Sequence, residues 1–389
     1  MSPLETIRRA HDELTAIRRD LHAHPELGMN EHRTAEVVAR KLEEWGIEVH
    51  RGVGGTGVVG VLRSGNGPGA IGLRADMDAL PIAEASGAAY ASENPGTMHA
   101  CGHDGHTTML LGAARYLAET RAFNGTVNFI FQPGEEGAGG ALAMLQDGLF
   151  KRFPCDRIYG IHNRPGMKVG QYAISPGASS AGGAFFDIVV TGRGAHGARP
   201  EESVDPVLVA CHIGTALQSL ISRNLSPWKA AVLSVTKIEG GAAYNVIPGG
   251  ATLAGTARAM QRETLEMLEQ GIARIAANVA AAFGATATSD FRVIFAPLIN
   301  DAASAQEFAD AAAELVGEDK VDRNRSPGMG SEDFSFMMEQ VPGAHINLGN
   351  GDSAALHNHL YDFNDQAIPY GVALYGAIVE KRLPKTDLR

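Results

Sequence analysis

The stretch HTTMLLGAARYLAETRAFNGTVNFIF, residues 106–131, indicates the fold most directly. Apolar residues recur at helical spacing over residues 106–117, and residues 126–131 have the length and composition of a buried strand. The neighbouring segments alternate in the same way, with strands predicted at 70–74 and 157–161 and a helix at 140–145. Such alternation is typical of an α/β domain. We therefore expect a mostly parallel central sheet that is flanked by helices.

The pattern changes after about residue 180. Strands are predicted at 184–190, 231–236, 251–257 and 291–294, and helices at 204–222 and 263–282. This β-α-β-β-α-β order is that of a ferredoxin-like α+β module. The remaining segment returns to helices and short apolar strands that can complete the first sheet. We expect a small domain, residues 181–294, inserted into a larger discontinuous domain formed by residues 1–180 and 295–389.

Composition limits the classes of function. The 33 basic and 44 acidic residues give a net charge of −11, which argues against nucleic-acid binding. No apolar run approaches the roughly 18 residues that a membrane span needs. Residues 1–27 lack the apolar core of a signal peptide. We expect a protein of the cytoplasm that does not contact membranes. Its three cysteines are an odd number in a long chain, so a metal-binding or buried thiol is favoured over a disulfide framework.

A Gly-x-Gly-x-x-Gly pattern at Gly52, Gly54 and Gly57 raises the alternative of a dinucleotide site. Such a site requires a helix directly after the glycines. Here the segment 58–62 predicts a strand, followed by a Gly-Asn-Gly turn and another strand. The structural context therefore argues against nucleotide binding.

Chemically active side chains follow the predicted strands at their carboxyl ends. The strand at 70–74 leads into Asp76 and Asp78, the strand at 126–131 into Glu135 and Glu136, and the strand at 157–161 into His162. In open α/β sheets, ligands bind at this edge. The segment MHACGHDGH, residues 98–106, adds Cys101 and His103 at the start of a helix, and LHNHLYDFND, residues 356–365, adds further histidines.

Thiolate, imidazole and carboxylate together suit zinc or another divalent first-row metal. Alone, a Cys-x-His pair is usually incidental and a Glu-Glu pair is usually a solvated turn. Their joint occurrence at strand ends favours a metal site. Pro133 and the glycines around Glu135 and Glu136 permit a bend, so that one carboxylate binds metal while the other acts as a general base toward water. On the residues alone, His357 and His359 are both candidate ligands and the number of ions stays open.

At these residues the chain resembles the metal-dependent amidohydrolase family that includes hippurate hydrolase, N-acyl-amino-acid amidohydrolases and plant auxin-conjugate hydrolases, within the carboxypeptidase and aminoacylase superfamily. The resemblance covers nearly the whole chain. It is carried by LHAHPELG, GLRADMDALPI, MHACGHDGHT, FQPGEEG, GIHN, GRGAHGARPEESVDP, YNVIP, GTAR, GSEDFSF and LHNHLYDFND.

The resemblance implies two divalent ions per subunit, manganese or zinc, with cobalt or nickel as alternatives. The ligands that it implies are Cys101, His103, Glu136, His162 and His357. It also implies Glu135 as the general base and Asp78 as a carboxylate that orients a ligand. The family commonly has proline where this chain has His359, so that residue stays open as a neighbour of the ligands, a substrate contact or an inert residue.

For residues 181–294 the resemblance implies a lid that mediates a homodimer, with a tetramer as an alternative. His196 would stabilise the oxyanion across the dimer, and Asn245 and Arg258 would bind the substrate carboxylate. A guanidinium suits that task because its planar fork matches a carboxylate.

The sequence thus predicts a metal-dependent amidohydrolase that cleaves hippurate-like, N-acetyl or indole-acetyl amino acids into a carboxylic acid and a free amino acid. Hydrolysis of a dipeptide or an aryl amine by the same site is an alternative. A third hypothesis, from another class, is a metal-stabilised binding protein without catalysis. The presence of Glu135 argues against it, since binding needs no free base beside a metal.

Overall fold

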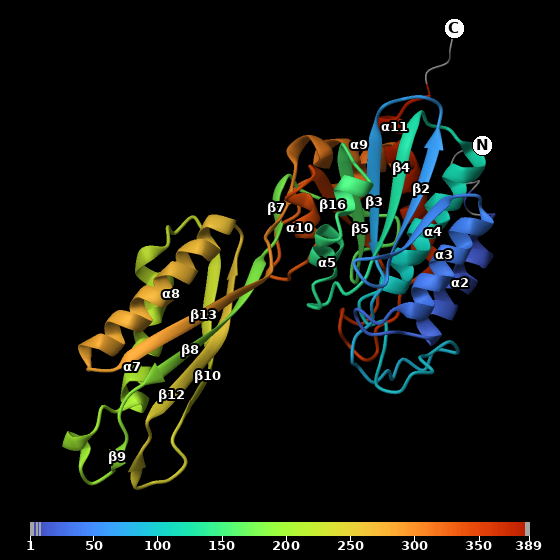
Figure 1. Ribbon diagram of the computed structural model, residues 1–389. Coiled ribbons are helices and arrows are strands. Elements are labelled where there is room, and N and C mark those ends of the chain that lie inside the picture. Colours follow the sequence, from blue (N-terminus) through green and yellow to red (C-terminus); the bar gives the residue numbers. More distant parts are fainter. Residues whose placement is uncertain (1–3, 5–6, 8, 386–389) are drawn as a thin grey trace. The chain divides into compact units, whose positions relative to one another are not determined.

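The computed structural model describes Leu4, Ile7 and residues 9–385. Within these residues the chain forms two compact units (Figure 1). The first comprises the chain up to Ser179, Ile299–Ser326 and the chain from Asp333 onward; the second comprises Ser180–Leu298 and Pro327–Glu332. The second unit thus includes a short segment beyond the predicted insertion. The backbone explains this, because the Ala181 N–H donates to the carbonyls of Gly328 and Gly330, at 3.1 and 3.0 Å.

The first unit is built on a sheet in the order β1-β2-β4-β3-β5-β16-β6-β15. The central strands β4, β3, β5 and β16 are parallel. The pairs β1–β2, β2–β4 and β16–β6 are antiparallel, and β15 pairs in parallel with β6. The strand bounds are β1 Glu48–Val53, β2 Gly57–Ser64, β3 Ala70–Asp76, β4 Gly125–Gln132, β5 Arg157–Arg164, β6 Tyr172–Ala173, β15 Val321–Asp322 and β16 Gly343–Gly349. The predicted mostly parallel sheet is confirmed.

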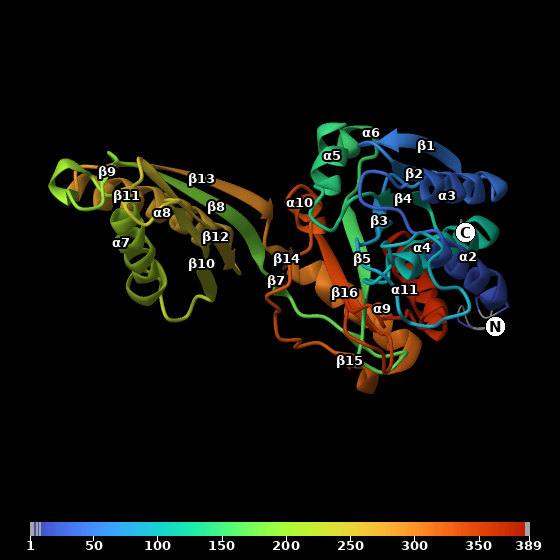
Figure 2. The ribbon, with the colours of Figure 1, turned by 90° about the horizontal axis from the view of Figure 1, so that it is seen from below.

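Helices cover both faces of this sheet (Figure 2). One layer contains α2 His11–Ala23, α3 His32–Glu44, α4 His103–Thr120, α9 Ala302–Val316 and α11 Ile368–Arg382. The other face carries α5 Gly140–Gln146, next to α6 Leu149–Arg152 and α10 Phe334–Met338. Met109 and Leu110 of α4 and Phe129 of β4 are fully buried in one core. The apolar repeat and the apolar run of residues 106–131 therefore pack against each other as a helix on a sheet.

The second unit has the predicted ferredoxin-like order. Its antiparallel sheet runs β10-β12-β8-β13. The bounds are β8 Gly182–Thr191, α7 Pro206–Ser219, β10 Ala231–Gly240, β12 Gly250–Ala259, α8 Arg262–Ala282 and β13 Thr286–Phe295. Alternate strand residues such as Phe186, Ile188 and Leu253 form its own core with α7 and α8. Two further sheets have two strands each. One pairs β9 Ala195–His196 with β11 Val246–Ile247, and the other pairs β7 Gly177–Ser180 with β14 Leu298–Asn300, where the chain passes from one unit to the other.

None of the helices in the described part of the chain combines the length and apolarity that crossing a bilayer requires.

Candidate metal centre

The candidate centre lies at the carboxyl edge of the parallel strands. Asp76 ends β3, Glu135 follows the end of β4, and His162 lies in the last part of β5. Because β3 pairs in parallel with both β4 and β5, these three ends meet at one edge of the sheet. The segment before α4 brings Cys101 to the same edge.

Gly102 shapes the turn that presents Cys101 and His103. Its φ is 90°, in the left-handed region that favours glycine, and α4 begins at the next residue. His103 is fully buried, and its Nδ1 lies 2.9 Å from the carbonyl and 3.1 Å from the carboxylate of Asp78. An imidazole that donates from Nδ1 keeps the lone pair of Nε2 free. Among the described residues, this buried Nε2 has no hydrogen-bond partner, which is the state expected of a metal ligand.

The chain turns sharply between β4 and α5, as the sequence predicted from its proline and glycines. Gly134 has a φ of 55° and opens the turn at residues 135–138. Acceptors and donors from elsewhere hold this turn in place. The Glu136 N–H donates to Asp78 Oδ2 at 3.0 Å, and the Asp333 N–H donates to Glu135 Oε1 at 3.2 Å. Both glutamates are thereby fixed at the sheet edge.

Two sets of donor atoms share the Cys101 thiol. One set is Cys101, His103 and His162, the other is Cys101, Glu136 and His357, and within each set the donor atoms lie within 4.8 Å of one another. Sγ of Cys101 is 3.5 Å from Nε2 of His162. Nε2 of His357 is 3.0 Å from Oε1 of Glu136. This mixture of sulfur, nitrogen and oxygen donors fits zinc and other first-row divalent metals.

A third set places the remaining glutamate beside the ligands. Donor atoms of His103, Glu135 and Glu136 also lie within 4.8 Å of one another. Glu135 is buried, whereas Glu136 is partly exposed. One carboxylate can therefore bind a metal ion while its neighbour stays within reach of a water molecule at the same place.

The two histidines that the sequence left open differ in surroundings. The His357 N–H donates to the Ala100 carbonyl at 2.8 Å, which ties this residue to the Cys101 segment. The φ of His357 is 64°, which is unusual for a residue other than glycine. Such backbone conformations cluster at functional sites. The side chain of His359 is exposed, and its carbonyl accepts the Ala85 N–H at 2.8 Å. His357 is thus the one that joins a donor set.

Burial and mutual charge set the protonation of the centre. Burial raises the pKa of the Cys101 thiol. Burial would lower the pKa of His103, but the nearby Asp76 and Cys101 outweigh it and the pKa lies well above its ordinary value. Burial would raise the pKa of Asp78, yet its hydrogen bond with His103 holds that pKa low. Metal binding here would displace protons, because a thiol and an imidazole bind metals only when deprotonated.

His106, the last residue of the CGHDGH segment, is engaged elsewhere. Its Nδ1 is 2.6 Å from Asp76 Oδ1, and its Nε2 accepts the Asn163 N–H at 2.9 Å. Both ring nitrogens therefore have partners within the protein. Asp76 and His106 are both buried, and Oδ2 of Asp76 lies 3.7 Å from Nε2 of His103.

A second buried network, which the sequence did not reveal, lies around Asp104. Arg18 of α2 is fully buried, donates to Asp365 at 2.7 Å and lies 3.4 Å from Asp104. His22 lies 2.8 Å from the same Asp104 carboxylate. The sequence signal was a charged residue on a buried helix face, since Arg18 shares that face with Leu14. This network connects α2 to α4 and to the loop that follows His357.

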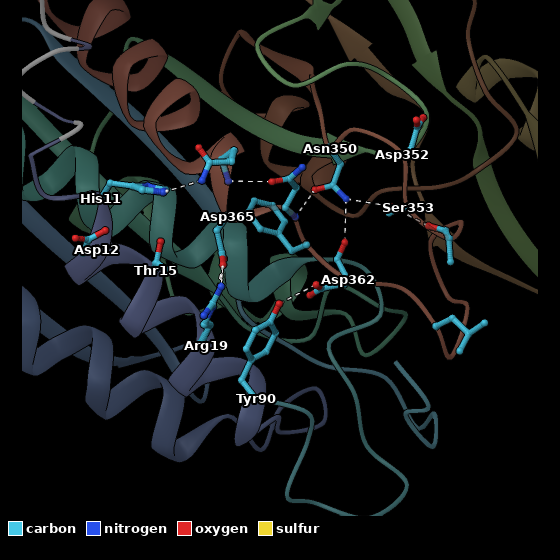
Figure 3. A pocket seen from close by; sticks show the side chains of 15 residues that line it. His11, Asp12, Thr15, Arg19, Tyr90, Asn350, Asp352, Ser353, Asp362 and Asp365 are labelled. Carbon is cyan, nitrogen blue, oxygen red and sulfur yellow. Dashed lines mark hydrogen bonds and ion pairs between the residues drawn. The ribbon is translucent and has the colours of Figure 1, made fainter. Parts of the chain in front are cut away.

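Figure 3 shows the surface end of this network. Arg19 donates to Asp365 at 2.9 Å, and the Tyr90 hydroxyl donates to Asp362 at 2.8 Å. These residues line a polar hollow of about 680 Å³ between α2 and the 350–366 loop. Its lining residues include none of the predicted metal ligands, so the hollow is separate from the centre.

The other predicted functional residues belong to the second unit. His196 ends β9, which pairs with β11 at Val246, and the Gly197 N–H donates to the Asn245 carbonyl at 2.7 Å. His196 and Asn245 are therefore neighbours on this unit. Arg258 lies on β12, and its Nη1 is 3.4 Å from the Ser331 hydroxyl. Burial lowers the pKa of Arg258. The metal-ligand candidates come from the first unit, and these three groups come from the second.

A parallel α/β sheet that gathers such donors and a further buried carboxylate at its carboxyl edge is typical of a metal-dependent hydrolase. The model of peptidase family M20/M25/M40 matches residues 72–381, and the chain belongs to this family.

Two relatives and one solved structure support this family assignment. The hippurate hydrolase of Campylobacter jejuni is 42% identical over 384 residues, which are 98% of this chain and 100% of that protein. An IAA-amino acid hydrolase (ILR1-like 4) of Arabidopsis thaliana is 38% identical over 96% of this chain and 86% of its own length. A Bacillus subtilis protein described as a dinuclear metal-binding peptidase from the M20 family is 33% identical and superposes with a TM-score of 0.85, covering 97% of this chain and 99% of that chain.

Proposed function

We propose that this protein hydrolyses the amide bond of N-acyl amino acids, such as hippurate or N-acetyl and indole-acetyl conjugates, and releases a carboxylic acid and a free amino acid. The observation that carries this proposal is Glu135, a buried carboxylate beside two donor sets that share Cys101. The full-length similarity to a hippurate hydrolase supports the choice of substrate class. A chain that only bound such compounds would have no use for a general base there.

Two divalent ions are the cofactors we propose, with manganese or zinc favoured over cobalt or nickel. Cys101, His103 and His162 would hold one ion, and Cys101, Glu136 and His357 the other. The buried Nε2 of His103, which has no hydrogen-bond partner among the described residues, supports this assignment. When bound, the ions would polarise the acyl carbonyl and lower the pKa of water at the site.

The protein's own groups supply the proton transfers and the orientation. Glu135 takes a proton from the attacking water as the carbon–oxygen bond forms. It then passes that proton to the nitrogen of the leaving amine, and the carbon–nitrogen bond breaks. The Asp333 N–H aims Glu135 by donating to Oε1 at 3.2 Å. Asp78 keeps His103 in the tautomer whose Nε2 faces the centre.

The second unit contributes the substrate contacts in this proposal. His196 would donate a hydrogen bond to the oxyanion that develops on the acyl oxygen. Asn245 and Arg258 would bind the carboxylate of the amino-acid part. Burial lowers the pKa of Arg258, since it disfavours the charged guanidinium. The carboxylate of a substrate would supply an opposite charge beside it.

We also propose that the second unit is a lid that mediates a homodimer. Several of its large apolar side chains are exposed, among them Leu208, Val232, Ile238, Tyr244 and Val246. Exposed apolar surface of this kind is typical of protein–protein contacts. Sedimentation velocity of the wild type should give the mass of a dimer, and a monomer at micromolar concentration would contradict this assignment.

A cytoplasmic location is the remaining part of the proposal. Cys101, Cys155 and Cys211 are all free thiols, as expected in a reducing compartment. Cell fractionation tests it directly, since recovery of the protein with secreted material would contradict it.

The decisive test of the catalytic role compares Glu135→Gln with Glu136→Gln. Glu135→Gln should keep both ions and lose about 100-fold or more of kcat, the usual contribution of a general base. Glu136→Gln should instead weaken binding of one ion. Metal content by elemental analysis separates the two effects.

A Glu135→Gln variant with undiminished turnover rules out Glu135 as the general base. A metal-loaded wild type that binds N-acyl amino acids without cleaving them would favour the hypothesis of a binding protein over that of an enzyme. If only dipeptides or aryl amines were hydrolysed, they would replace N-acyl amino acids as the substrate class.

A further inference from the structure

One side-chain amide contacts several of the segments that carry metal-ligand candidates. Asn163 follows His162 directly on β5 and is buried. Its Nδ2 donates to the Cys101 carbonyl at 2.6 Å and lies 3.0 Å from Nε2 of His106. Its Oδ1 accepts the hydroxyl of Tyr361 at 2.8 Å. Asn163 thus spans the segment before α4, the end of β5 and the loop that carries His357.

Tyr361 brings the last of these segments into the arrangement. It follows His357 by four residues, is fully buried and donates its hydroxyl to Asn163 across 198 residues of sequence. The loop also contacts the Cys101 segment through its backbone, since the His357 N–H donates to Ala100. A single buried hydrogen bond between side chains therefore joins the His357 loop to the strand that carries His162.

The space around Gly102 shows how closely this pair is fitted to the ligand turn. A Cβ on Gly102 would overlap Nδ2 of Asn163 and approach Oη of Tyr361 to 2.5 Å. The polar atoms of Asn163 and Tyr361 therefore occupy the space that the Cβ atom of any other residue at position 102 would need. The absence of a side chain at Gly102 serves the contact with the pair as well as the left-handed turn.

We propose that Asn163 and Tyr361 form a positioning pair that fixes the spacing of Cys101, His162 and His357, and so sets the affinity of the centre for its ions. The inference rests on the proposed function, because the same residues are taken as metal ligands there. Neither residue touches the reacting atoms in this assignment. Groups that orient metal ligands typically contribute about 10- to 100-fold in metal affinity or activity.

The pair acts on one donor set more than on the other. His103 is the first residue of α4 and His162 lies on β5, whereas His357 lies in a loop. Loss of the Tyr361 hydroxyl releases that loop from Asn163 and leaves the bond from Asn163 to the Cys101 carbonyl in place. The set of Cys101, Glu136 and His357 should therefore weaken first.

The test uses Tyr361→Phe, which removes one oxygen from a buried ring. Tyr172→Phe is the matched control. Tyr172 is equally buried, and its hydroxyl donates to one acceptor, the Tyr370 carbonyl, at 2.9 Å between β6 and α11. Full-length wild type and both variants are stripped with chelator and titrated with Zn²⁺ against a competing chelator. Thermal unfolding of the metal-free proteins reports the purely structural cost of each substitution.

We expect Tyr361→Phe to bind one of the two ions, the one assigned to Cys101, Glu136 and His357, at least about tenfold less tightly, while Tyr172→Phe matches the wild type. The thermal midpoints of the two metal-free variants should fall by similar amounts. A Tyr361→Phe affinity within twofold of the control overturns the positioning role. Asn163→Ala provides a second route, since it should weaken both ions through Cys101, and unchanged affinity in that variant would also overturn it. A wild type that binds no ion would overturn the proposed metal centre itself, an outcome distinct from a loss confined to the variants.

Discussion

Replacing His22 with glutamine should flatten the pH dependence of folding stability between about pH 6.5 and 9. His22 is fully buried, with Nδ1 2.8 Å from Asp104 Oδ2 and Nε2 3.3 Å from Glu84 Oε1. Burial opposes a charged ring, but the two carboxylates outweigh it and raise the pKa of His22 from 6.5 to about 9. The folded protein therefore keeps the proton over a range of pH in which the unfolded chain has lost it.

The sign and size of the effect follow from this difference. A raised pKa stabilises the folded state fully below the unfolded value of 6.5, and the stabilisation is lost as the pH rises through about 9. At about 1.36 kcal/mol for each pKa unit, the difference between 6.5 and about 9 corresponds to about 3 kcal/mol. The variant, which has no titrating ring at this position, lacks this contribution at every pH.

Urea unfolding of metal-free wild type and His22→Gln at pH 6, 7.5 and 9.5 measures the difference. The free energy of unfolding of the wild type should fall by about 3 kcal/mol more than that of the variant across this range. All other groups titrate in both proteins, so their contributions cancel in the comparison. Parallel pH profiles would refute the reasoning, because they would mean that His22 does not hold a proton between Asp104 and Glu84.

Three further predictions test other parts of the structure. Gly102→Ala should lower the thermal midpoint by several degrees, because φ is 90° there and the added Cβ would overlap Asn163; an unchanged midpoint would contradict the close fit. Glu31→Ala removes the buried acceptor of the Gly134 N–H at 2.7 Å and should lower kcat at least about tenfold. Asp301→Ala, at the N-terminus of α9, is its control for stability, and equal kcat in the two would exclude a role for Glu31 in the turn. Arg258→Lys should raise KM about tenfold for N-acyl amino acids but not for their carboxamides, and an equal rise for both would exclude a carboxylate contact.

The elements of the fold were predictable because local pattern determines them. Residues 106–131 carry both the helical and the strand pattern, and each packs as expected in one core. The order of strands was not predictable in the same way, since β16 joins β5 across nearly half the chain. Such pairing depends on burial between distant segments, for which a single sequence has no local signal.

The edge of the sheet that carries the candidate site was also predictable. Strand ends direct polar residues to the carboxyl edge of a parallel sheet, so Asp76, Glu135 and His162 meet there by topology alone. The supporting residues were not predictable, because Arg18 reaches Asp104 and Asp365 across 86 and 347 residues of sequence. The contacts of Asn163 could not be predicted for the same reason, although the sequence made its neighbour His162 a candidate ligand.

The central claim is that this centre hydrolyses N-acyl amino acids with divalent metal. The most direct measurement is the release of free amino acid from hippurate, N-acetyl amino acids, indole-acetyl amino acids and dipeptides, by chelator-stripped protein and by the same protein reloaded with Mn²⁺ or Zn²⁺. We expect turnover of at least one N-acyl amino acid that is lost on stripping and restored on reloading. Equal turnover with and without metal, or none across the panel at confirmed metal occupancy, would contradict the account.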